Sequence, residues 1–460
     1  MAKKPSRALA RIVVGLLFAL GAVAVVSVVR VGSPPEVAIE PSAPGIGRKT
    51  PVTVKVGSPG RGLTDVKVEL TQGEHSKVIA EKTYRPRPFW ALWGQRTTTD
   101  ELAVEVGKDT MPELKGGEAV IRVTAGRAGT WLRHPAPTVV EATLPVRLTP
   151  PALSLMSIQN NVMQGGSEVV VYRVGPTAKR DGVAAGDWWF PGYPLPGGGA
   201  EDRFCLYAAP FDLADPSRIQ LEAEDEVGNV ARVSFVDRFT ARPPTEATIE
   251  LSDAFLAKAV PEILAQATEV EDQGELLPSY LAINRDLRRA NNGKLAEIAR
   301  GSRPEFLWTK PFRQLGNTQV MASFADHRSY RYNDQVVDHQ YHLGFDLASH
   351  KHAPVTAANR GVVVLAGYLG IYGNTVVLDH GYGLMTLYSH LSSIDVSPGQ
   401  EVEEGQKLGA TGETGLAAGD HLHFSVVLHG LPVTPVEWWD GRWIRDHLKA
   451  KLGAALPFAG

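Results

Sequence analysis

Apolar and polar residues alternate along much of the chain after residue 36. In a strand, successive side chains point to opposite faces, so a period of two is typical of a half-buried strand. Glycine- and proline-containing segments separate the alternating runs, as expected of turns between strands. The runs in this part of the chain cover residues 52–56, 66–70, 119–123 and 139–148. We therefore predict a β-sandwich module over residues 36–149.

A second series of strand-like runs follows the pair Pro150-Pro151. Its last two runs, 219–223 and 230–235, flank an acidic turn that contains Gly and Asn. This hairpin resembles the end of bacterial immunoglobulin-like modules, although no Cys–Trp–Cys pattern accompanies it. We predict a second β-sandwich over residues 150–240. The aromatic run 188–190 is expected to pack in the core or against a loop, with a carbohydrate platform as the alternative.

Between residues 250 and 300 the apolar spacing changes to three and four, which is typical of amphipathic helices. Ser252 suits the N-cap of a first helix. A second helix around residues 281–287 is expected to end in the Asn-Asn-Gly sequence at 291–293. The helical segment 250–300 is predicted to be either a linker or a cover over a cleft in the domain that follows.

An apolar run over residues 12–29 precedes all of these modules. As a helix, its eighteen residues span about 27 Å, close to the hydrocarbon thickness of a bilayer. The only candidate cleavage sequence, Ala-Val-Ala at 22–24, lies inside the run, which favours an uncleaved anchor over a cleaved signal peptide. Arg30 closes the run, and the basic residues that precede it are Lys3, Lys4, Arg7 and Arg11.

These basic residues are expected to remain inside the cell. We predict that residues 1–30 form a cytoplasmic tail and single-pass anchor in the inner or cytoplasmic membrane. The remainder would lie outside the cytoplasm, and a cleaved, secreted form is the alternative.

Composition narrows the possible chemistry. A length of 460 residues allows about three domains. The net charge of −3 gives no reason to expect a nucleic-acid partner, which would favour a strongly basic domain. Cys205 is the only cysteine, which excludes an intrachain disulfide framework and a cysteine-rich metal site. A metal ion would therefore be held by histidines and carboxylates, and no organic cofactor is predicted.

Histidines are concentrated near the end of the chain, with ten of the 13 between His327 and His429. They mark three clusters: Tyr-His-Leu-Gly-Phe-Asp at 341–346, Leu-Tyr-Ser-His-Leu at 387–391, and His-Leu-His-Phe at 421–424. Residues two apart on a strand share a face, and an H-x-x-x-D step returns to one face if the chain between is extended. Two imidazoles and one carboxylate suit Zn²⁺ and leave a fourth position open, as in catalytic zinc sites.

Together these motifs resemble the signature of the lysostaphin/LytM-type zinc endopeptidases. The pattern is H-x-x-x-D, then Y-x-H-L, then T-G-x-T-G followed by H-L-H-F, in that order over residues 315–440. The resemblance implies that the metal ligands are His342, Asp346 and His423. It implies that His390 and His421 are catalytic and flank a zinc-bound water and the tetrahedral intermediate.

The resemblance also implies a small antiparallel β-sheet domain with an open groove, which we place at residues 310–445. Asp420 departs from the family pattern and is expected to be a turn residue without an essential role. The remaining histidines of this region are expected at the surface or in hydrogen bonds, namely His327, His339, His350, His352, His380 and His429. The predicted fold class is thus mainly β, with an anchor, two β-sandwiches, a helical segment and a zinc peptidase domain.

The implied activity is hydrolysis of peptide cross-links in peptidoglycan during cell-wall remodelling, through a zinc-bound water. The expected partners are peptidoglycan and, through the N-terminal helix, the membrane; a regulatory protein partner is left open. The upstream modules would be spacers or wall-binding modules. Two alternatives are a non-enzymatic activator of another wall hydrolase and a peptidase that acts on exported proteins. The complete set of five site residues argues against the activator.

Overall fold

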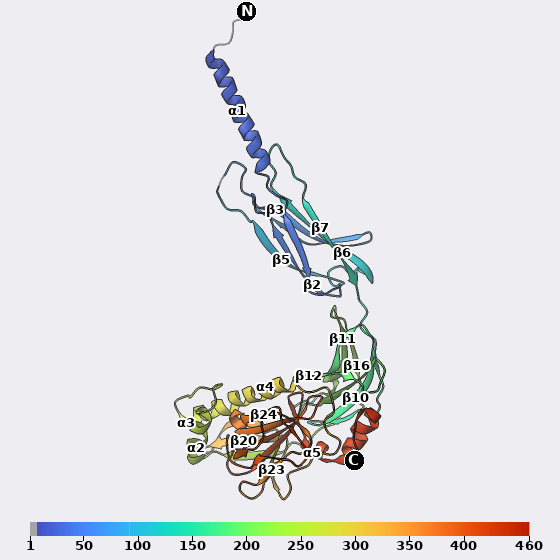
Figure 1. Cartoon of the computed structure of the whole chain (residues 1–460), viewed down its shortest axis with the longest axis vertical. Helices are drawn as coiled ribbons and strands as arrows, with labels where there is room; N and C mark the ends of the chain where they lie inside the picture. The colour runs from blue at the N-terminus through green and yellow to red at the C-terminus, as the bar shows by residue number, and fades with distance from the viewer. Residues whose placement is uncertain (1–6, 92, 460) are drawn as a thin grey trace, which may run out of the picture. The chain divides into compact units, whose positions relative to one another are not determined.

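The computed structural model describes residues 7–91 and 93–459 (Figure 1), and for residues 7–10 it describes the backbone alone. Lys3 and Lys4 of the predicted basic tail lie outside the described residues. The chain divides into two compact units, the first ending at Pro151 apart from two short pieces, 177–179 and 224–230. Most elements are strands, which confirms the prediction of a mainly β chain.

The N-terminal apolar run forms helix α1 (Arg7–Val29). Among the described residues it is the one helix long and apolar enough to cross a membrane, over Arg11–Val29 with a mean hydropathy of 2.9. Nearly all of its described side chains are exposed in the protein alone. An apolar helix that no protein layer covers is what a bilayer-spanning segment requires, although a signal sequence has the same composition.

The first unit continues as a β-sandwich. Sheet order β1-β2-β5 is formed by β1 (Glu36–Pro41), β2 (Thr50–Gly57) and β5 (Thr99–Val106). Sheet order β4-β3-β6-β7 is formed by β3 (Leu63–Gln72), β4 (His75–Thr83), β6 (Gly117–Arg127) and β7 (Thr138–Val146). The core contains the apolar positions of the predicted runs, such as Val54, Val68 and Ile121, all fully buried. Alternation therefore predicted the inward face of these strands correctly.

A second β-module begins the second unit. One sheet has the order β13-β14-β10-β8, from β8 (Leu153–Leu155), β10 (Ser167–Val174), β13 (Tyr193–Pro194) and β14 (Asp202–Ala208). The other has the order β12-β11-β15-β16, from β11 (Ala178–Ala185), β12 (Trp188–Pro191), β15 (Ile219–Asp225) and β16 (Val230–Ser234). A short helix, η1 (Pro216–Arg218), precedes β15. Two further strands, β9 (Asn161–Met163) and β17 (Arg238–Thr240), pair in parallel. In the aromatic run, Phe190 is fully buried and the two tryptophans are half-buried.

An eight-stranded, largely antiparallel sheet forms the centre of the C-terminal part. Its order is β19-β22-β30-β26-β25-β24-β28, with β31 paired to β30. The strands are β19 (Gln319–Ala322), β22 (Phe345–Ala348), β24 (Gly361–Tyr368), β25 (Asn374–Asp379), β26 (Leu384–Ser389), β28 (Glu401–Val402), β30 (Leu422–Leu428) and β31 (Leu431–Val433). A small sheet of order β23-β29-β27 joins it, from β23 (Pro354–Thr356), β27 (Ser393–Ile394) and β29 (Lys407–Ala410).

A third sheet borders the predicted metal site. It consists of β18 (Glu246–Glu250), β20 (Asp326–Tyr332) and β21 (Gln335–His342) in the order β18-β20-β21. β18 runs parallel to β20, whereas β20 and β21 form an antiparallel hairpin. In the sequence, the helical segment follows β18 and precedes β20, which are neighbouring strands of this sheet.

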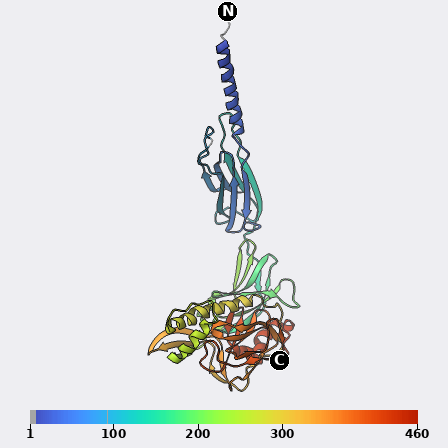
Figure 2. The ribbon, with the colours of Figure 1, turned by 60° about the vertical axis from the view of Figure 1, so that its left-hand side comes forward.

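The helices of that segment are α2 (Asp253–Leu264), α3 (Leu276–Ala282), a π-helical turn (Ile283–Leu287) and α4 (Arg288–Ala299). The side chain of Ser252 caps α2, as predicted. Figures 1 and 2 place these helices along one face of the large sheet. Their apolar residues share one core with sheet residues, among them Leu256, Leu287 and Leu295 from the helices and Leu387 and Val427 from the strands.

The predicted helix end at 291–293 is wrong, because α4 continues to Ala299. The Asn291 side-chain oxygen accepts a hydrogen bond from the Ile371 N–H at 3.0 Å, and Asn292 accepts one from the Tyr372 hydroxyl at 2.9 Å. These contacts use the polar groups that would otherwise favour a turn, and burial of Ala299 stabilises the last turn.

The chain ends in short helical turns that pack on the second β-module. They are α5 (Pro435–Trp439), α6 (Gly441–Trp443), a π-helical turn (Ile444–Lys449), α7 (Ala450–Leu452) and η5 (Gly453–Ala455). Glu168, fully buried in β10, pairs with Lys451 at 2.9 Å and with His447 at 2.7 Å. Glu437 accepts a hydrogen bond from the Ser167 N–H at 2.7 Å. Because buried charges are stable only when paired, the ion pairs of Glu168 fix the C-terminal segment to the module, and the bond to Glu437 adds a further contact.

Candidate metal centre

Three strands bring the predicted ligands together. His342 is the last residue of β21, Asp346 lies in β22, and His423 lies in β30. Asp346 and His423 are directly opposite each other in the antiparallel β22–β30 pair. Opposed residues on one face of a sheet have neighbouring Cβ atoms, so their side chains meet.

The expected geometry of H-x-x-x-D is wrong in one respect. The chain between His342 and Asp346 is not one extended strand, because β21 ends at His342 and β22 begins in another sheet at Phe345. Gly344 lies in this crossing. A Cβ atom there would lie 2.5 Å from Ser425 Oγ and 2.7 Å from the His423 ring. Only glycine permits the chain to pass this close to a ligand residue.

The three donor atoms form a small triangle. His342 Nε2, Asp346 Oδ1 and His423 Nδ1 each lie 3.0 Å from the other two. They make up the one group of metal-ligand side chains found among the described residues. Bonds of about 2.0–2.1 Å around a tetrahedral Zn²⁺ would separate its donors by roughly 3.3–3.4 Å. The observed spacing of 3.0 Å is shorter by a few tenths of an ångström, so an ion of this size would fit after a small outward shift of the donors.

Hydrogen bonds on the far side of each ring determine which ring nitrogen faces the triangle with a lone pair. His342 Nδ1 donates to the Ser323 carbonyl at 2.9 Å. Ser425 Oγ donates to the Leu343 carbonyl, so its oxygen accepts from His423 Nε2 at 3.0 Å. In a neutral histidine the other ring nitrogen then carries a lone pair. Two nitrogen lone pairs and a carboxylate oxygen thus face one point, an arrangement that a metal ion satisfies.

The charge state of the donors agrees with this. Burial lowers the pKa of His423 to about 4, so the ring is neutral at neutral pH. Burial raises the pKa of Asp346, but the neighbouring histidines, His342 above all, outweigh it and hold that pKa well below its usual range. Arg328 also donates to Asp346 Oδ2 at 2.9 Å, so one carboxylate oxygen is held while Oδ1 faces the histidines. Neutral imidazoles with an ionised carboxylate are the forms that bind metal.

His390 and His421 lie together beside this group, with ring centres 4.9 Å apart. His390 Nδ1 donates to the Thr414 carbonyl at 2.7 Å, and His421 Nδ1 donates to the Gly419 carbonyl at 2.8 Å. Each ring therefore keeps Nε2 for the cleft. His390 has a left-handed backbone with φ of 61°, a conformation uncommon outside glycine and often found at functional sites.

The two rings differ in proton affinity. Burial lowers the pKa of His390 well below its usual value, and the nearby His421 and His423 lower it further. Burial also lowers the pKa of His421, but its hydrogen bond to Asp346 and that carboxylate's charge outweigh burial and raise the pKa. The Nε2 atom of His421 lies 3.4 Å from Asp346 Oδ1. The pair can thus hold one proton-poor and one proton-rich imidazole side by side.

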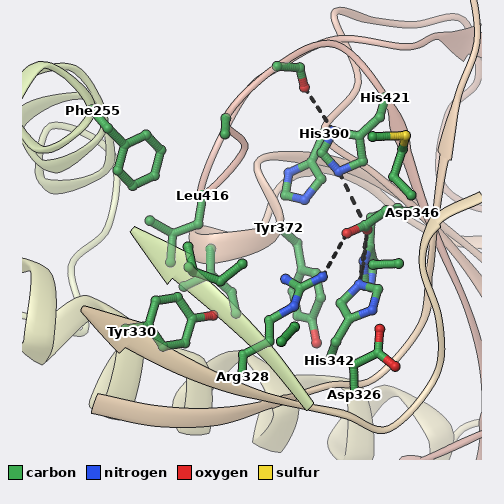
Figure 3. A pocket seen from close by; sticks show the side chains of 18 of the residues that line it. Phe255, Asp326, Arg328, Tyr330, His342, Asp346, Tyr372, His390, Leu416 and His421 are labelled. Atoms are coloured by element: carbon green, nitrogen blue, oxygen red, sulfur yellow. Dashed lines mark hydrogen bonds and ion pairs between the residues drawn. The ribbon is translucent and has the colours of Figure 1, made fainter. Parts of the chain in front are cut away.

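A cleft of about 490 Å³ opens over these five residues. In Figure 3, His390 and His421 lie on one side of Asp346 and His342 on the other, whereas Phe255, Leu416 and Tyr330 lie at the opposite end. The wall at that end comes from β18, β20 and the helical segment, which contributes Phe255, Tyr280 and Arg288. The helical segment is therefore one wall of the cleft.

Several residues that hold the site were not identified from the sequence. Arg328, Ser323 and Ser425 each bond to a predicted ligand, and Tyr372 packs with its ring centre 5.7 Å from that of His423. Ser425 had a usable signal, since it lies two residues after His423 on one strand face. Arg328 and Ser323 had none, because neither lies within a recognised motif.

The other histidines of the region stay outside the group of three. His339 stacks on His327 with ring centres 5.3 Å apart, and the Ser329 hydroxyl contacts Nδ1 of His339. His380 is buried and bonds to the Arg360 carbonyl and to Thr386. Of the remaining three, His350 and His352 are exposed and His429 is half-buried.

Asp420, the departure from the motif, has a structural role in its loop. Its carboxylate accepts from Thr411 Oγ1 at 2.5 Å and from the His352 N–H at 3.2 Å. These bonds join the segment before His421 to the Thr-Gly-x-Thr-Gly segment. Asp420 therefore positions the loop that carries His421.

Comparison with known proteins agrees with this geometry. Residues 340–435 match Peptidase family M23, and they form a domain of that family at the C-terminal end of the chain. The DD-carboxypeptidase/endopeptidase Mpg of Neisseria meningitidis serogroup B is 38% identical over 119 residues, which are 26% of this chain and 26% of that protein. The peptidoglycan DD-endopeptidase ShyA of Vibrio cholerae serotype O1 is 30% identical over 172 residues, 37% of each.

A crystal structure of a putative peptidase M23 from Pseudomonas aeruginosa has 22% sequence identity and a TM-score of 0.37, and the match covers 62% of this chain and 96% of that one. The chain spans only 26% and 37% of the length of these two curated relatives. The family match thus identifies the peptidase domain, a metallopeptidase type, and confirms the resemblance found in the sequence motifs.

Proposed function

We propose that this chain is a zinc endopeptidase that hydrolyses peptide cross-links of peptidoglycan. The observation that carries the proposal is the triangle of His342, Asp346 and His423 donor atoms, with the Nε2 atoms of His390 and His421 beside it. Relatives named peptidoglycan DD-endopeptidases support peptidoglycan as the substrate. The predicted boundaries of the peptidase domain, 310–445, remain part of this proposal.

In this proposal the ligands would be His342, Asp346 and His423. When bound, Zn²⁺ supplies a Lewis acid that polarises a carbonyl and lowers the pKa of water. Arg328 holds Oδ2 of Asp346, which would leave Oδ1 as the metal ligand, and Ser425 fixes the tautomer of His423. Outer hydrogen bonds of this kind orient ligands and strengthen their binding.

His390 and His421 would move protons. Each ring is oriented by a carbonyl that accepts from Nδ1, so Nε2 is the atom that takes or gives a proton. One ring takes a proton from the attacking water, and the other donates a hydrogen bond to the developing oxyanion; the proton then passes to the leaving amine. Neither ring has to rotate for these steps, because its orientation is already set.

The cleft suits an extended peptide with charged groups. Its far end is apolar, and two guanidinium groups, Arg288 and Arg328, line its wall. Arg288 donates to Asn284 and forms no ion pair within the described residues, so it keeps donor capacity for a substrate carboxylate. A peptide substrate that bears a free carboxylate would satisfy this group.

The location completes the proposal. Helix α1 would act as a single-pass anchor in the inner or cytoplasmic membrane, with the catalytic domain on the outer side, where peptidoglycan lies. The β-modules predicted at 36–149 and 150–240 would then be spacers between membrane and wall. The helical segment 250–300 would be a fixed wall of the cleft, because its apolar residues are part of the domain core.

Metal content and substrate cleavage test the proposal together. We expect one zinc ion per purified wild-type chain and in the control His339→Ala, and loss of zinc in His423→Ala. Zinc-loaded wild type should release cross-linked muropeptides from purified sacculi, and mapping of the products identifies the bond that is cut. Equal zinc in His423→Ala would refute the ligand assignment.

Cleavage of an unrelated protein but not of sacculi would favour a peptidase of exported proteins. Stimulation of an added hydrolase without cleavage of its own would favour an activator.

A further inference from the structure

Two segments of the first β-sandwich lie at the end where α1 enters it. One joins β4 to β5 (84–98, of which residue 92 is outside the described part), and the other joins β6 to β7 (128–137). Figure 1 shows both beside the last turn of α1. They carry three tryptophans with largely exposed side chains: Trp90 at 71%, Trp93 at 80% and Trp131 at 57%. Such exposure is unusual for the largest aromatic side chain in a protein surrounded by water alone.

Both segments are bonded directly to the end of the helix. The Arg30 guanidinium donates to the carbonyls of Phe89 and Ala91, at 2.6 and 2.5 Å. On the other side, Trp131 Nε1 donates to Ser27 Oγ at 3.1 Å, and Thr130 Oγ1 donates to the Ser27 carbonyl at 3.0 Å. The tryptophans are therefore held at the level where the apolar helix ends.

A buried arginine joins the two segments to each other. Arg61 donates from Nε to the Arg87 carbonyl and from Nη1 to the Gly129 carbonyl, both at 2.6 Å. Arg61 is 8% exposed, and these two backbone groups accept from two of its three guanidinium nitrogens. The two segments consequently form one surface, which we call the collar (84–98 and 128–137).

The collar is basic. It contains Arg85, Arg87, Arg96 and Arg133 and has no Asp or Glu. Arg96 and Arg133 are exposed and form no ion pair with a carboxylate among residues 7–91 and 93–459. An acid-free surface of this kind attracts phosphate groups.

We propose that the collar rests in the headgroup layer of the bilayer that holds α1. Tryptophan is enriched at membrane–water interfaces because its ring is apolar and its N–H is polar, and arginine pairs with lipid phosphates. The collar begins where the apolar run closes at Arg30, so it continues the membrane contact of α1 onto the sandwich. The proposal requires α1 to be retained as an anchor, and it is independent of the peptidase chemistry.

The consequence is a fixed attachment of the first sandwich. A helix alone would leave the domain free to tilt about the end of the helix. Insertion of two segments on opposite sides of that end restricts such tilting, because both would have to leave the headgroup layer together. The collar is therefore a second anchoring device that uses side chains in place of a second helix.

Spin-label accessibility in the full-length chain tests this. Cys205, the only native cysteine, is fully buried, so an introduced cysteine can be labelled selectively. The label positions are Trp93→Cys and Leu132→Cys in the collar, and Lys115→Cys as the control. Lys115 is exposed just before β6 starts, and the eleven residues of β6 separate it from the collar by roughly 35 Å.

The chain is reconstituted into vesicles of phosphatidylethanolamine and phosphatidylglycerol. We expect labels at 93 and 132 to be at least threefold less accessible to a water-soluble nickel chelate than the label at 115, and more accessible to oxygen. Equal nickel accessibility at the three positions would overturn the proposal, as would isolation of the mature chain without α1. Because the readout needs neither zinc nor substrate, its failure is separate from failure of the proposed function.

Discussion

Replacement of Gly344 by alanine is the sharpest test of the metal site, because it adds one methyl group and removes no ligand. The new Cβ would lie 2.5 Å from Ser425 Oγ and 2.7 Å from Cε1 and Nε2 of the His423 ring. Ordinary contacts between such atoms begin at about 3.4 Å. The His423 ring is buried and cannot swing into solvent. Either this ring or the chain at residue 344 must therefore move by roughly 0.7–0.9 Å.

This displacement exceeds the tolerance of a metal site, which is about 0.5 Å. It also breaks the bond from His423 Nε2 to Ser425, which fixes the tautomer and orientation of the ring. Disruption of such an outer bond typically weakens metal binding by about 10–100-fold. At about 1.4 kcal/mol for each factor of ten, the expected cost is about 1.4–2.8 kcal/mol of zinc binding free energy.

Zinc affinity of Gly344→Ala is measured by competition with a chelator, and unfolding of the metal-free form is measured beside it. Gly367→Ala is the matched control, because nothing lies within 4 Å of its added Cβ and its φ is not in the left-handed region. We expect weaker zinc binding in Gly344→Ala alone. Wild-type affinity in Gly344→Ala would show that His423 is not held where the donor triangle requires it.

The remaining expectations concern proton transfer, pH and folding. His390→Ala and His421→Ala should retain zinc and lose about 10²-fold or more of turnover, measured as rate and metal content on one sample; near-normal turnover with lost zinc would contradict their roles. Burial raises the pKa of Glu437 to about 8, so the folded chain holds a proton that the unfolded chain releases near 4.5. The stability that this proton provides is full below pH 4.5 and is lost as pH rises through 8. Glu437→Gln should therefore be more stable than the wild type by up to a few kcal/mol at pH 9 but not at pH 4, as measured by denaturant unfolding. Identical pH dependence of the two proteins would refute this. A chain that starts at Arg303 should fail to fold, seen as lost near-ultraviolet circular dichroism, because it lacks the helical half of the core; a folded, active fragment would refute it.

The sequence predicted those features that depend on neighbouring residues. Alternation identified the inward positions of the first sandwich, such as Val54 and Val68, because burial on a strand follows a period of two. The resemblance of the three histidine motifs to a known family signature also identified residues that the structure brings together. Each motif can be recognised within a few residues of sequence.

Features that depend on distant contacts could not be predicted in this way. The end of α4 was placed too early, because Asn291 and Asn292 bond to a loop about eighty residues away. The ion pair of Glu168 with Lys451 joins residues 283 apart and has no local pattern at either end. Arg328 was missed for the same reason, since its role exists only once β20 lies beside β22. Tertiary contacts override local propensity at each of these positions.

The placement of His423 in the middle of the large sheet also determines when the site can exist during folding. His342 and His423 are 81 residues apart, and β30 must insert between β22 and β26 before the donor atoms meet. Bringing such distant residues together carries a loop-closure entropy that only the finished sheet repays. A partly folded chain therefore has no complete donor triangle. The triangle forms as a late step of folding, once β30 has joined the sheet.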